Sequence, residues 1–119
     1  MTDEAGLWAA IRRADCGWFG IKPFASNSVF KGDSSPKSPA FEEDNRTARL
    51  CIRSILANPA ITAPMPGMIS VQQVDNIAEA VRERRQLDRQ EKADLDRAMD
   101  RAWASLTPDY QFLKDWETV

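Results

Sequence analysis

The 119-residue sequence contains no histidine. Histidine is the commonest general base and metal ligand near neutral pH, so catalytic triads built on imidazole and the usual histidine-ligated metal sites are excluded. Cysteine is scarce as well. Cys16 and Cys51 follow no metal-ligand spacing and are too few for a dense disulfide framework. The sequence therefore predicts no metal site, and its cysteines fit a reduced cytoplasm.

Long apolar runs and an excess of one charge are also missing. No apolar stretch approaches the ~20 residues of a membrane span, and the acidic start Met1–Glu4 lacks the basic residues of a secretory signal. The net charge of −2 creates no general attraction to nucleic acid or anionic lipid. Arginines at 46, 49, 53 and 82–89 are interleaved with acidic residues, which indicates solvated ion pairs. We expect a cytoplasmic protein with neither nucleic-acid nor membrane partners.

The length suits a single domain with a real core. Hydrophobic periodicity predicts four main helices, at 3–14, 42–57, 70–85 and 88–106. The short apolar stretches 18–21 and 61–63 are bounded by glycine or proline, and we interpret them as buried strands. A strand, a helix and a second strand in this order form a βαβ unit with parallel strands. The predicted fold class is α/β and helix-rich.

The periodicity also predicts which helix faces are buried. In the helix at 70–85 we expect five apolar residues to point inward: Val71, Val74, Ile77, Ala78 and Val81. In the helix at 88–106 we expect a buried stripe of six residues: Leu95, Ala98, Met99, Ala102, Trp103 and Leu106. The pair Met99 and Trp103, four residues apart, predicts core packing rather than a ligand site. Residues 107–119 carry an apolar face made by Tyr110, Phe112, Leu113 and Trp116, so we expect this segment to be a docking tail.

The stretch from Ile61 to Asn76 resembles a strand, a glycine loop and a helix start. Pro66 and Gly67 suit a tight loop, and Ser70 with Gln73 three residues later forms a capping-box pattern. Such a helix terminus favours an anion such as a pyrophosphate. Many junctions of this kind bind nothing, so the alternative is a purely structural cap. Parallel strands would place this loop beside the turn at residues 22–23, in one crevice.

These motifs together resemble the C-terminal part of an aldo-keto reductase. The resemblance rests on 17–25 (GWFGIKPFA), on the helix before Asn58-Pro59, and on 66–76 (PGMISVQQVDN). Aldo-keto reductases are (β/α)8 TIM barrels that reduce carbonyls with NADPH or NADH. The resemblance implies one partial-barrel domain over 1–119, with about the last two β/α units plus C-terminal helices. Residues 18–22 and 61–63 would be the seventh and eighth strands, and the loop 25–40 a lid over the cofactor.

The resemblance also implies which residues contact the cofactor, NADP or NAD. The adenosine half would meet Gly67, Met68, Gln73 and Asn76, and the nicotinamide and pyrophosphate would lie beside Lys22 and Pro23. Two positions depart from the family pattern. Ile21 stands where many members place an aromatic ring under the nicotinamide. Gly67 and Gln73 are neutral where many NADPH users carry lysine or arginine, which leaves the choice of cofactor open.

The family's catalytic aspartate, tyrosine, lysine and histidine come from earlier strands that have no counterpart in this sequence. We therefore expect a truncated reductase-like segment that carries part of the nicotinamide-cofactor site and is inactive alone. The alternative is a small helical protein–protein interaction module. Its apolar faces would then be buried by self-association or by the missing part of the barrel.

Overall fold

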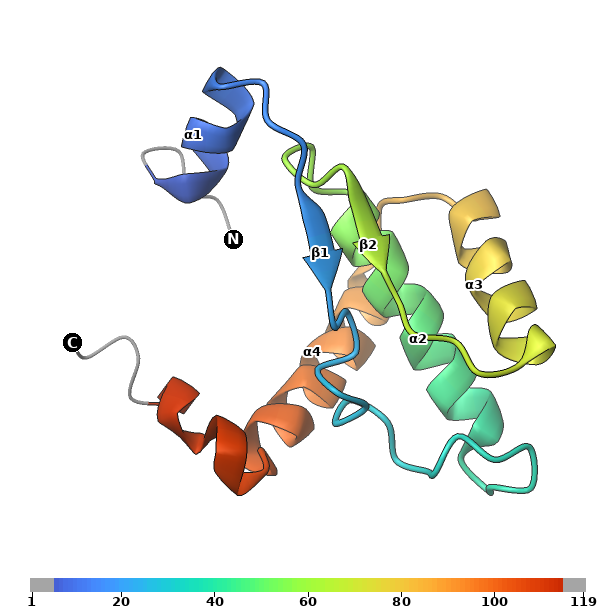
Figure 1. Cartoon of the computed structure of the whole chain (residues 1–119). Coiled ribbons are helices and arrows are strands. Elements are labelled where there is room, and N and C mark those ends of the chain that lie inside the picture. Colours follow the sequence, from blue (N-terminus) through green and yellow to red (C-terminus); the bar gives the residue numbers. More distant parts are fainter. Residues whose placement is uncertain (1–5, 115–119) are drawn as a thin grey trace.

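The protein, seen here as a computed structural model, is described over residues 6–114 (Figure 1). Its elements in chain order are α1 (Leu7–Arg13), β1 (Phe19–Ile21), α2 (Phe41–Leu56), β2 (Ala63–Met65), α3 (Val71–Arg82), α4 (Arg89–Ala104) and the 3-10 helix η1 (Pro108–Lys114). The predicted α/β, helix-rich class is confirmed at this level. The start of the first predicted helix and Trp116 of the predicted tail lie outside the described residues.

β1 and β2 form a two-stranded parallel sheet in which Phe19 pairs with Ala63 and Ile21 with Met65. The predicted parallel βαβ unit is thus confirmed, although β2 begins two residues later than expected. The preceding Thr62 side chain accepts a hydrogen bond from the Trp18 amide at 2.9 Å and joins the strands before the ladder begins. Pro64 is tolerated inside β2 because each strand of a two-stranded sheet has one unpaired edge.

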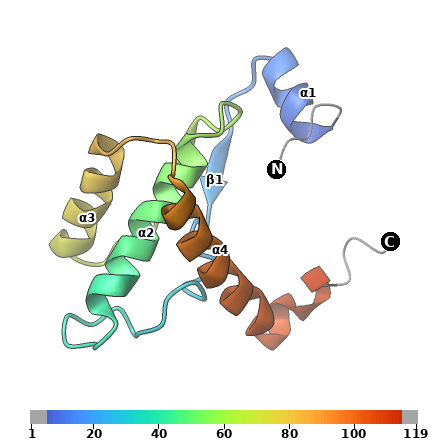
Figure 2. The ribbon, with the colours of Figure 1, turned by 180° about the vertical axis from the view of Figure 1, so that it is seen from behind.

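Only one face of the sheet is covered. Helix α2 crosses behind the strands in Figure 1 and lies in front of β1 in the reverse view of Figure 2. On the opposite face, side chains are strongly exposed: Phe19 is 62% accessible, Ile21 73% and Met65 56%. The expectation of buried strands was therefore wrong for this face. The apolar run at 18–21 satisfies the pattern of a covered strand, but no described element packs there.

The core is built around α2. Leu50, Cys51 and Ile52 are buried on this helix, and Ala80 of α3 and Leu95 of α4 complete the cluster with them. Helices α3 and α4 both pack on α2, and the two views show them on different sides of it. The buried stripe of α2 is therefore the surface on which the other helices pack.

The predicted inward faces of the other helices need correction. Val71, Val74 and Val81 of α3 are exposed, whereas Ile77 packs against the core as predicted. The buried Ala80 and the polar Asn76 also face α2. Polar contacts decide the rotation of this helix, because Asn76 donates to the Asn45 carbonyl oxygen at 3.0 Å. In α4, the buried residues include Leu95 and Ala98, whereas Met99 and Trp103 are about half exposed. The small alanine allows α4 to lie close to the core without using its larger side chains.

The predicted Ser70 cap is present, and α4 has a cap as well. Asp88 and Glu91 form a reciprocal capping box at the start of α4. Ser70 accepts a hydrogen bond from the Gln73 amide at the start of α3, while Gln73 Oε1 accepts from the amide of Ile69 rather than from that of Ser70. No helix within residues 6–114 is long and apolar enough to cross a bilayer.

Candidate functional site

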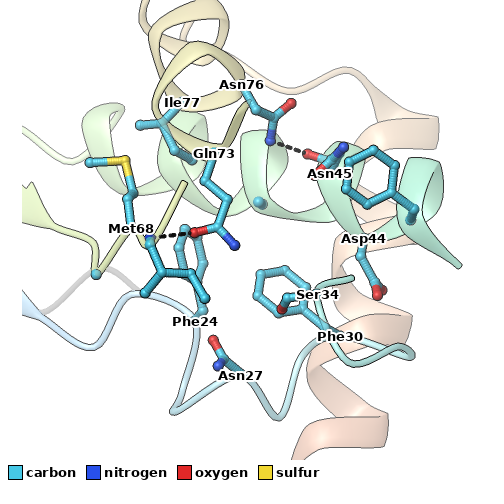
Figure 3. Close-up of a pocket in the computed structure, with 14 residues that line it drawn as sticks. Phe24, Asn27, Phe30, Ser34, Asp44, Asn45, Met68, Gln73, Asn76 and Ile77 are labelled. Atoms are coloured by element: carbon cyan, nitrogen blue, oxygen red, sulfur yellow. Dashed lines mark hydrogen bonds between the residues drawn. The ribbon is translucent and has the colours of Figure 1, made fainter. Parts of the chain in front are cut away.

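A pocket opens between the 25–40 loop, the start of α2 and the start of α3 (Figure 3). It follows the carboxyl ends of β1 and β2, the edge at which ligands of parallel sheets bind. Three phenylalanines contribute apolar walls: Phe24, Phe30 and Phe41. Polar side chains form much of the remaining lining: Asn27, Ser34, Asp44, Asn45, Gln73 and Asn76.

Asp44 holds the loop side of this pocket in place. Its carboxylate accepts hydrogen bonds from the backbone amides of Lys31 at 2.7 Å and Gly32 at 2.8 Å. The loop is closely packed at this point, because a Cβ atom on Gly32 would lie 3.0 Å from Asp44 Oδ2 and closer still to Ser38 Oγ. Val29 also anchors the loop in the core, with only 1% of its surface accessible. The loop predicted to be a lid is thus fastened to α2 at two points.

From the sequence alone, Asp44 is an acidic residue near the start of the predicted helix at 42–57, where a negative charge suits the helix dipole. Its actual role depends on the amides of Lys31 and Gly32, thirteen and twelve residues earlier, and the signal for it was the glycine-aspartate turn at 32–33. A carboxylate that accepts two backbone amides is a common way to order a polar loop. Asp44 therefore shapes the pocket wall rather than offering a free catalytic carboxylate.

Hydrogen bonds of two amide side chains hold the α3 side of the pocket in place. Gln73 uses its Oε1 atom to accept from the Ile69 amide at 2.8 Å. Asn76 uses both ends: Oδ1 accepts from Arg49 Nη1 at 2.6 Å, and Nδ2 donates to the carbonyl oxygen of Asn45 at 3.0 Å. These bonds connect the start of α3 to α2 and fix the width of the pocket.

The structure gathers four of the six predicted cofactor residues in this pocket, namely Gly67, Met68, Gln73 and Asn76. Lys22 and Pro23 follow β1 beside this edge but do not line the pocket. Trp18 precedes β1, at the end of the strand away from this pocket. Its ring packs on Trp8 with centroids 4.6 Å apart. Tryptophan fluorescence from that position therefore would not report on the pocket.

Lys22 is engaged by the last described helix. Its Nζ atom donates to the Tyr110 hydroxyl oxygen at 2.7 Å. This hydrogen bond, together with a second one from Ser26, lowers the pKa of Tyr110. Lys22 and Ser26 both have left-handed backbone angles, with φ of 53° and 55°, which cost roughly 1 kcal/mol each for residues with a Cβ. This contact joins η1 to the turn that follows β1.

The electrostatic character of the pocket is mildly acidic. Among its lining residues Asp44 is the only charged one, and there is no lysine or arginine. No group of three or more histidine, cysteine, aspartate or glutamate side chains suited to a metal ion occurs between residues 6 and 114. The lining therefore consists mainly of aromatic surfaces and amide groups.

A second polar cluster lies on α2 and is structural. Arg53, of which only 2% is accessible, donates to Glu91 at 2.9 and 3.0 Å and to Glu83 at 3.1 Å. It also donates to the Arg84 carbonyl oxygen at 2.7 Å. The expectation of a solvated arginine face was wrong at Arg53. The cluster fastens the α3–α4 connection to α2 and leaves no guanidinium proton free for a ligand.

Comparison with protein-family models, with curated proteins and with solved structures found no match for this chain.

Proposed function

We propose that this chain binds a nicotinamide dinucleotide through the pocket between the 25–40 loop and α3, and that it does not catalyse hydride transfer on its own. One observation carries this proposal. Gly67, Met68, Gln73 and Asn76 were selected by resemblance to aldo-keto reductases, and all four line a single pocket. The pocket lies where the carboxyl ends of two parallel strands meet, a usual position for nucleotide sites.

We also propose a finer fold assignment, in which this chain is part of a (β/α)8 barrel. The parallel β1–α2–β2 unit followed by α3 has the connectivity of two β/α units of a (β/α)8 barrel. The open face of the sheet is the face that the interior of a closed barrel would bury. A partial barrel therefore accounts for both the topology and the uncovered apolar residues.

Lack of activity follows from the side chains present. Carbonyl reduction requires a proton donor next to the carbonyl oxygen. The sequence has no histidine and only one tyrosine, and that tyrosine is paired with Lys22 rather than lining the pocket. The Asp44 oxygens are both occupied by backbone amides. The pocket thus has binding groups but lacks an available acid.

Calorimetric titration with NADH and NADPH, followed by an assay of NADH oxidation over a panel of aldehydes, tests the proposal. We expect binding with a dissociation constant of about 10–1000 µM, the range of a small open site, and no turnover. Gly67→Leu should weaken binding, because its Cβ position is open and the longer side chain would occupy the pocket.

Gly20→Leu is the matched control for this substitution. Its Cβ position is equally open and the residue does not line the pocket, so binding should be unchanged. Absence of dinucleotide binding by the folded protein would refute the proposed function. Turnover of an aldehyde would refute the proposal that the chain does not catalyse hydride transfer on its own.

A second candidate function, a self-association module, is favoured by the open sheet face. Phe19 and Ile21 of β1 and Met65 of β2 point away from α2 and are largely exposed. The outer edge of each strand is also unpaired within the described sheet. Such faces and edges favour pairing with a second copy of the chain.

A further inference from the structure

The outer edge of β1 has backbone hydrogen-bonding groups that are still available. In a parallel pair, the amide and carbonyl groups of successive residues point alternately toward the neighbouring strand and away from it. The carbonyl oxygen of Trp18 accepts from the amide of Thr62 at 2.9 Å, so this carbonyl faces β2. Gly20 therefore faces β2 as well. Phe19 and Ile21 direct their amides and carbonyls outward, where the described part of the chain supplies no backbone partner.

The outer edge of β2, in contrast, is blocked by a proline. Pro64 is the register partner of Gly20, so its nitrogen lies on the side of β2 that faces away from β1. This nitrogen carries no hydrogen, and a proline on an edge strand hinders the pairing of a further strand. In Figures 1 and 2 no described helix or strand lies beside the outer edge of β1. The sheet thus has one protected edge and one edge that can accept a strand.

The free edge of β1 is complementary to a second copy of itself. Two such strands related by a two-fold axis at Gly20 run antiparallel, with Phe19 of each copy opposite Ile21 of the other. Each of these two pairs exchanges two backbone hydrogen bonds, because both residues direct their N–H and C=O groups outward. Both side chains lie on the open face of the sheet, so each pair joins an aromatic ring to a β-branched side chain, a favourable cross-strand combination.

The area of this contact makes the association weak. A phenylalanine offers roughly 200 Å², so the 62% of Phe19 that is accessible contributes on the order of 120 Å². Ile21, which is 73% accessible, adds a similar area. The two copies together bury on the order of 500 Å² of apolar side chain, against roughly 1,200 Å² for a stable interface. A dimer that forms only at high concentration follows from these areas.

We propose that two copies of this chain join through the outer edges of β1 and form one continuous four-stranded sheet, in the order β2–β1–β1–β2, with a two-fold axis at Gly20. The inference rests on the self-association module that is the second candidate function. It specifies which edge pairs, in which direction and in which register, and it does not involve the pocket.

Disulfide cross-linking at the two-fold axis tests the inference. In the proposed pairing the two Gly20 residues form a non-hydrogen-bonded pair with Cα atoms about 4.5 Å apart, within the range of a disulfide. A Cβ atom at Gly20 meets no other atom within 4 Å, so a cysteine is accommodated. We expect Gly20→Cys, combined with Cys16→Ser, to form a covalent dimer when oxidised with diamide at about 100 µM protein. Cys51 is buried and does not compete.

Met65→Cys in the same Cys16→Ser background is the matched control. Met65 is exposed on the open face of β2. In the four-stranded sheet the two β2 strands are three spacings of about 4.8 Å apart, too far for a disulfide, so this variant should stay monomeric on a denaturing gel. Cross-linking through Met65 but not through Gly20 would show that the open faces stack, and it would overturn the inference.

Ile21→Pro is a second test that needs no added thiol. Proline removes the outward-facing amide of this residue and leaves the β1–β2 ladder intact, because the ladder uses the groups of Gly20. Two of the four hydrogen bonds between the copies are lost, so we expect light scattering to show dimerisation weakened about tenfold. Ile21→Val keeps the amide and the branched side chain, and it should dimerise like the wild type.

The outcomes separate this inference from the candidate function on which it rests. Equal dimerisation by the Ile21→Pro and Ile21→Val variants, or a wild-type dimer without cross-linking at Gly20, would overturn the edge pairing and leave self-association standing. A wild-type chain that stays monomeric at all concentrations would refute both. Circular dichroism shows whether each variant is folded. If Gly20→Cys does not fold, the pair of Ile21 variants decides.

Discussion

Arg53 shows how a single residue can organise three segments of this chain. Its guanidinium lies between the apolar side of α2 and the connection from α3 to α4. It bonds to two carboxylates and two backbone carbonyl oxygens. Burying an arginine is unfavourable unless its donors are satisfied, and here they are. Arg53 therefore fixes the position of the α3–α4 connection on α2 and does not contribute to the apolar core.

We predict that Arg53→Met destabilises the protein by about 3 kcal/mol, since it leaves Glu83 and Glu91 without their main cation. Urea unfolding followed by circular dichroism measures this change. Arg85→Met is the control, because Arg85 lies in the same connection and is exposed. A loss of similar size in both variants would contradict the role assigned to Arg53.

The two cysteines differ in reactivity. Cys51 is buried in the core, and burial raises the pKa of its thiol to about 11. Cys16 is exposed after α1. Because the thiolate is the reactive form, we predict that a thiol reagent such as DTNB modifies Cys16 rapidly in the folded protein and Cys51 only on unfolding. Rapid release of two equivalents from the native protein would contradict the burial of Cys51.

At the scale of elements, the start of α3 depends on its cap. Ser70 accepts from the Gln73 amide at 3.2 Å, and the loop before it forms part of the pocket. We predict that Ser70→Ala lowers the free energy of unfolding by about 1 kcal/mol. Ser54→Ala, on the exposed surface of α2, should leave it nearly unchanged. Urea denaturation of both variants tests the contribution of the cap.

The start of α4 makes stability depend on pH. The hydrogen bonds from Arg53 and then from the Asp88 amide lower the pKa of Glu91 to about 2, against an ordinary value of 4.5. A carboxylate with a lowered pKa stabilises the fold above its unfolded-state value and loses that effect as pH falls. We predict that the Glu91 contribution is complete above about pH 5 and is lost between about pH 4.5 and 2.

Unfolding experiments at several pH values measure this dependence. Glu91→Gln should be less stable than the wild type at pH 7 and should lose less stability on acidification. The exposed Glu42→Gln variant serves as a control for the removal of one negative charge. If acidification destabilises the Glu91→Gln variant as strongly as the wild type, the dependence arises elsewhere.

At the scale of the whole molecule, the uncovered face of the sheet is a surface of exposed apolar side chains. Ile21 is 73% accessible, and its neighbour Met65 is 56% accessible. We predict that the chain self-associates at concentrations of about 100 µM, because such a face favours burial against another copy. Light scattering coupled to size-exclusion chromatography measures the molar mass.

Ile21→Thr should shift the population toward the monomer, while Val81→Thr should have no effect. Val81 is a matched control, because it is a β-branched residue that is 61% exposed but lies on α3, away from the sheet. A compact monomer for the wild-type chain at all concentrations would rule out self-association through this face.

The sequence by itself determined the order of the elements and the parallel βαβ unit. Helical periodicity in α2, the capping residues Ser70 and Asp88, and the prolines around β2 are local signals, and each acts within a few neighbouring residues. The grouping of Gly67, Met68, Gln73 and Asn76 also follows from local spacing, since all four occur within ten residues around one helix start.

Only the tertiary structure decided the helix rotations and the partners of the polar side chains. The valines of α3 satisfy an inward-facing pattern, yet Asn76 and Arg49 turn the helix so that these valines are exposed. Arg53, Asp44 and Lys22 similarly depend on partners 12 to 88 residues away. Such contacts are set by packing between elements, which local periodicity does not encode, because a helix face is buried only where another element is available to cover it.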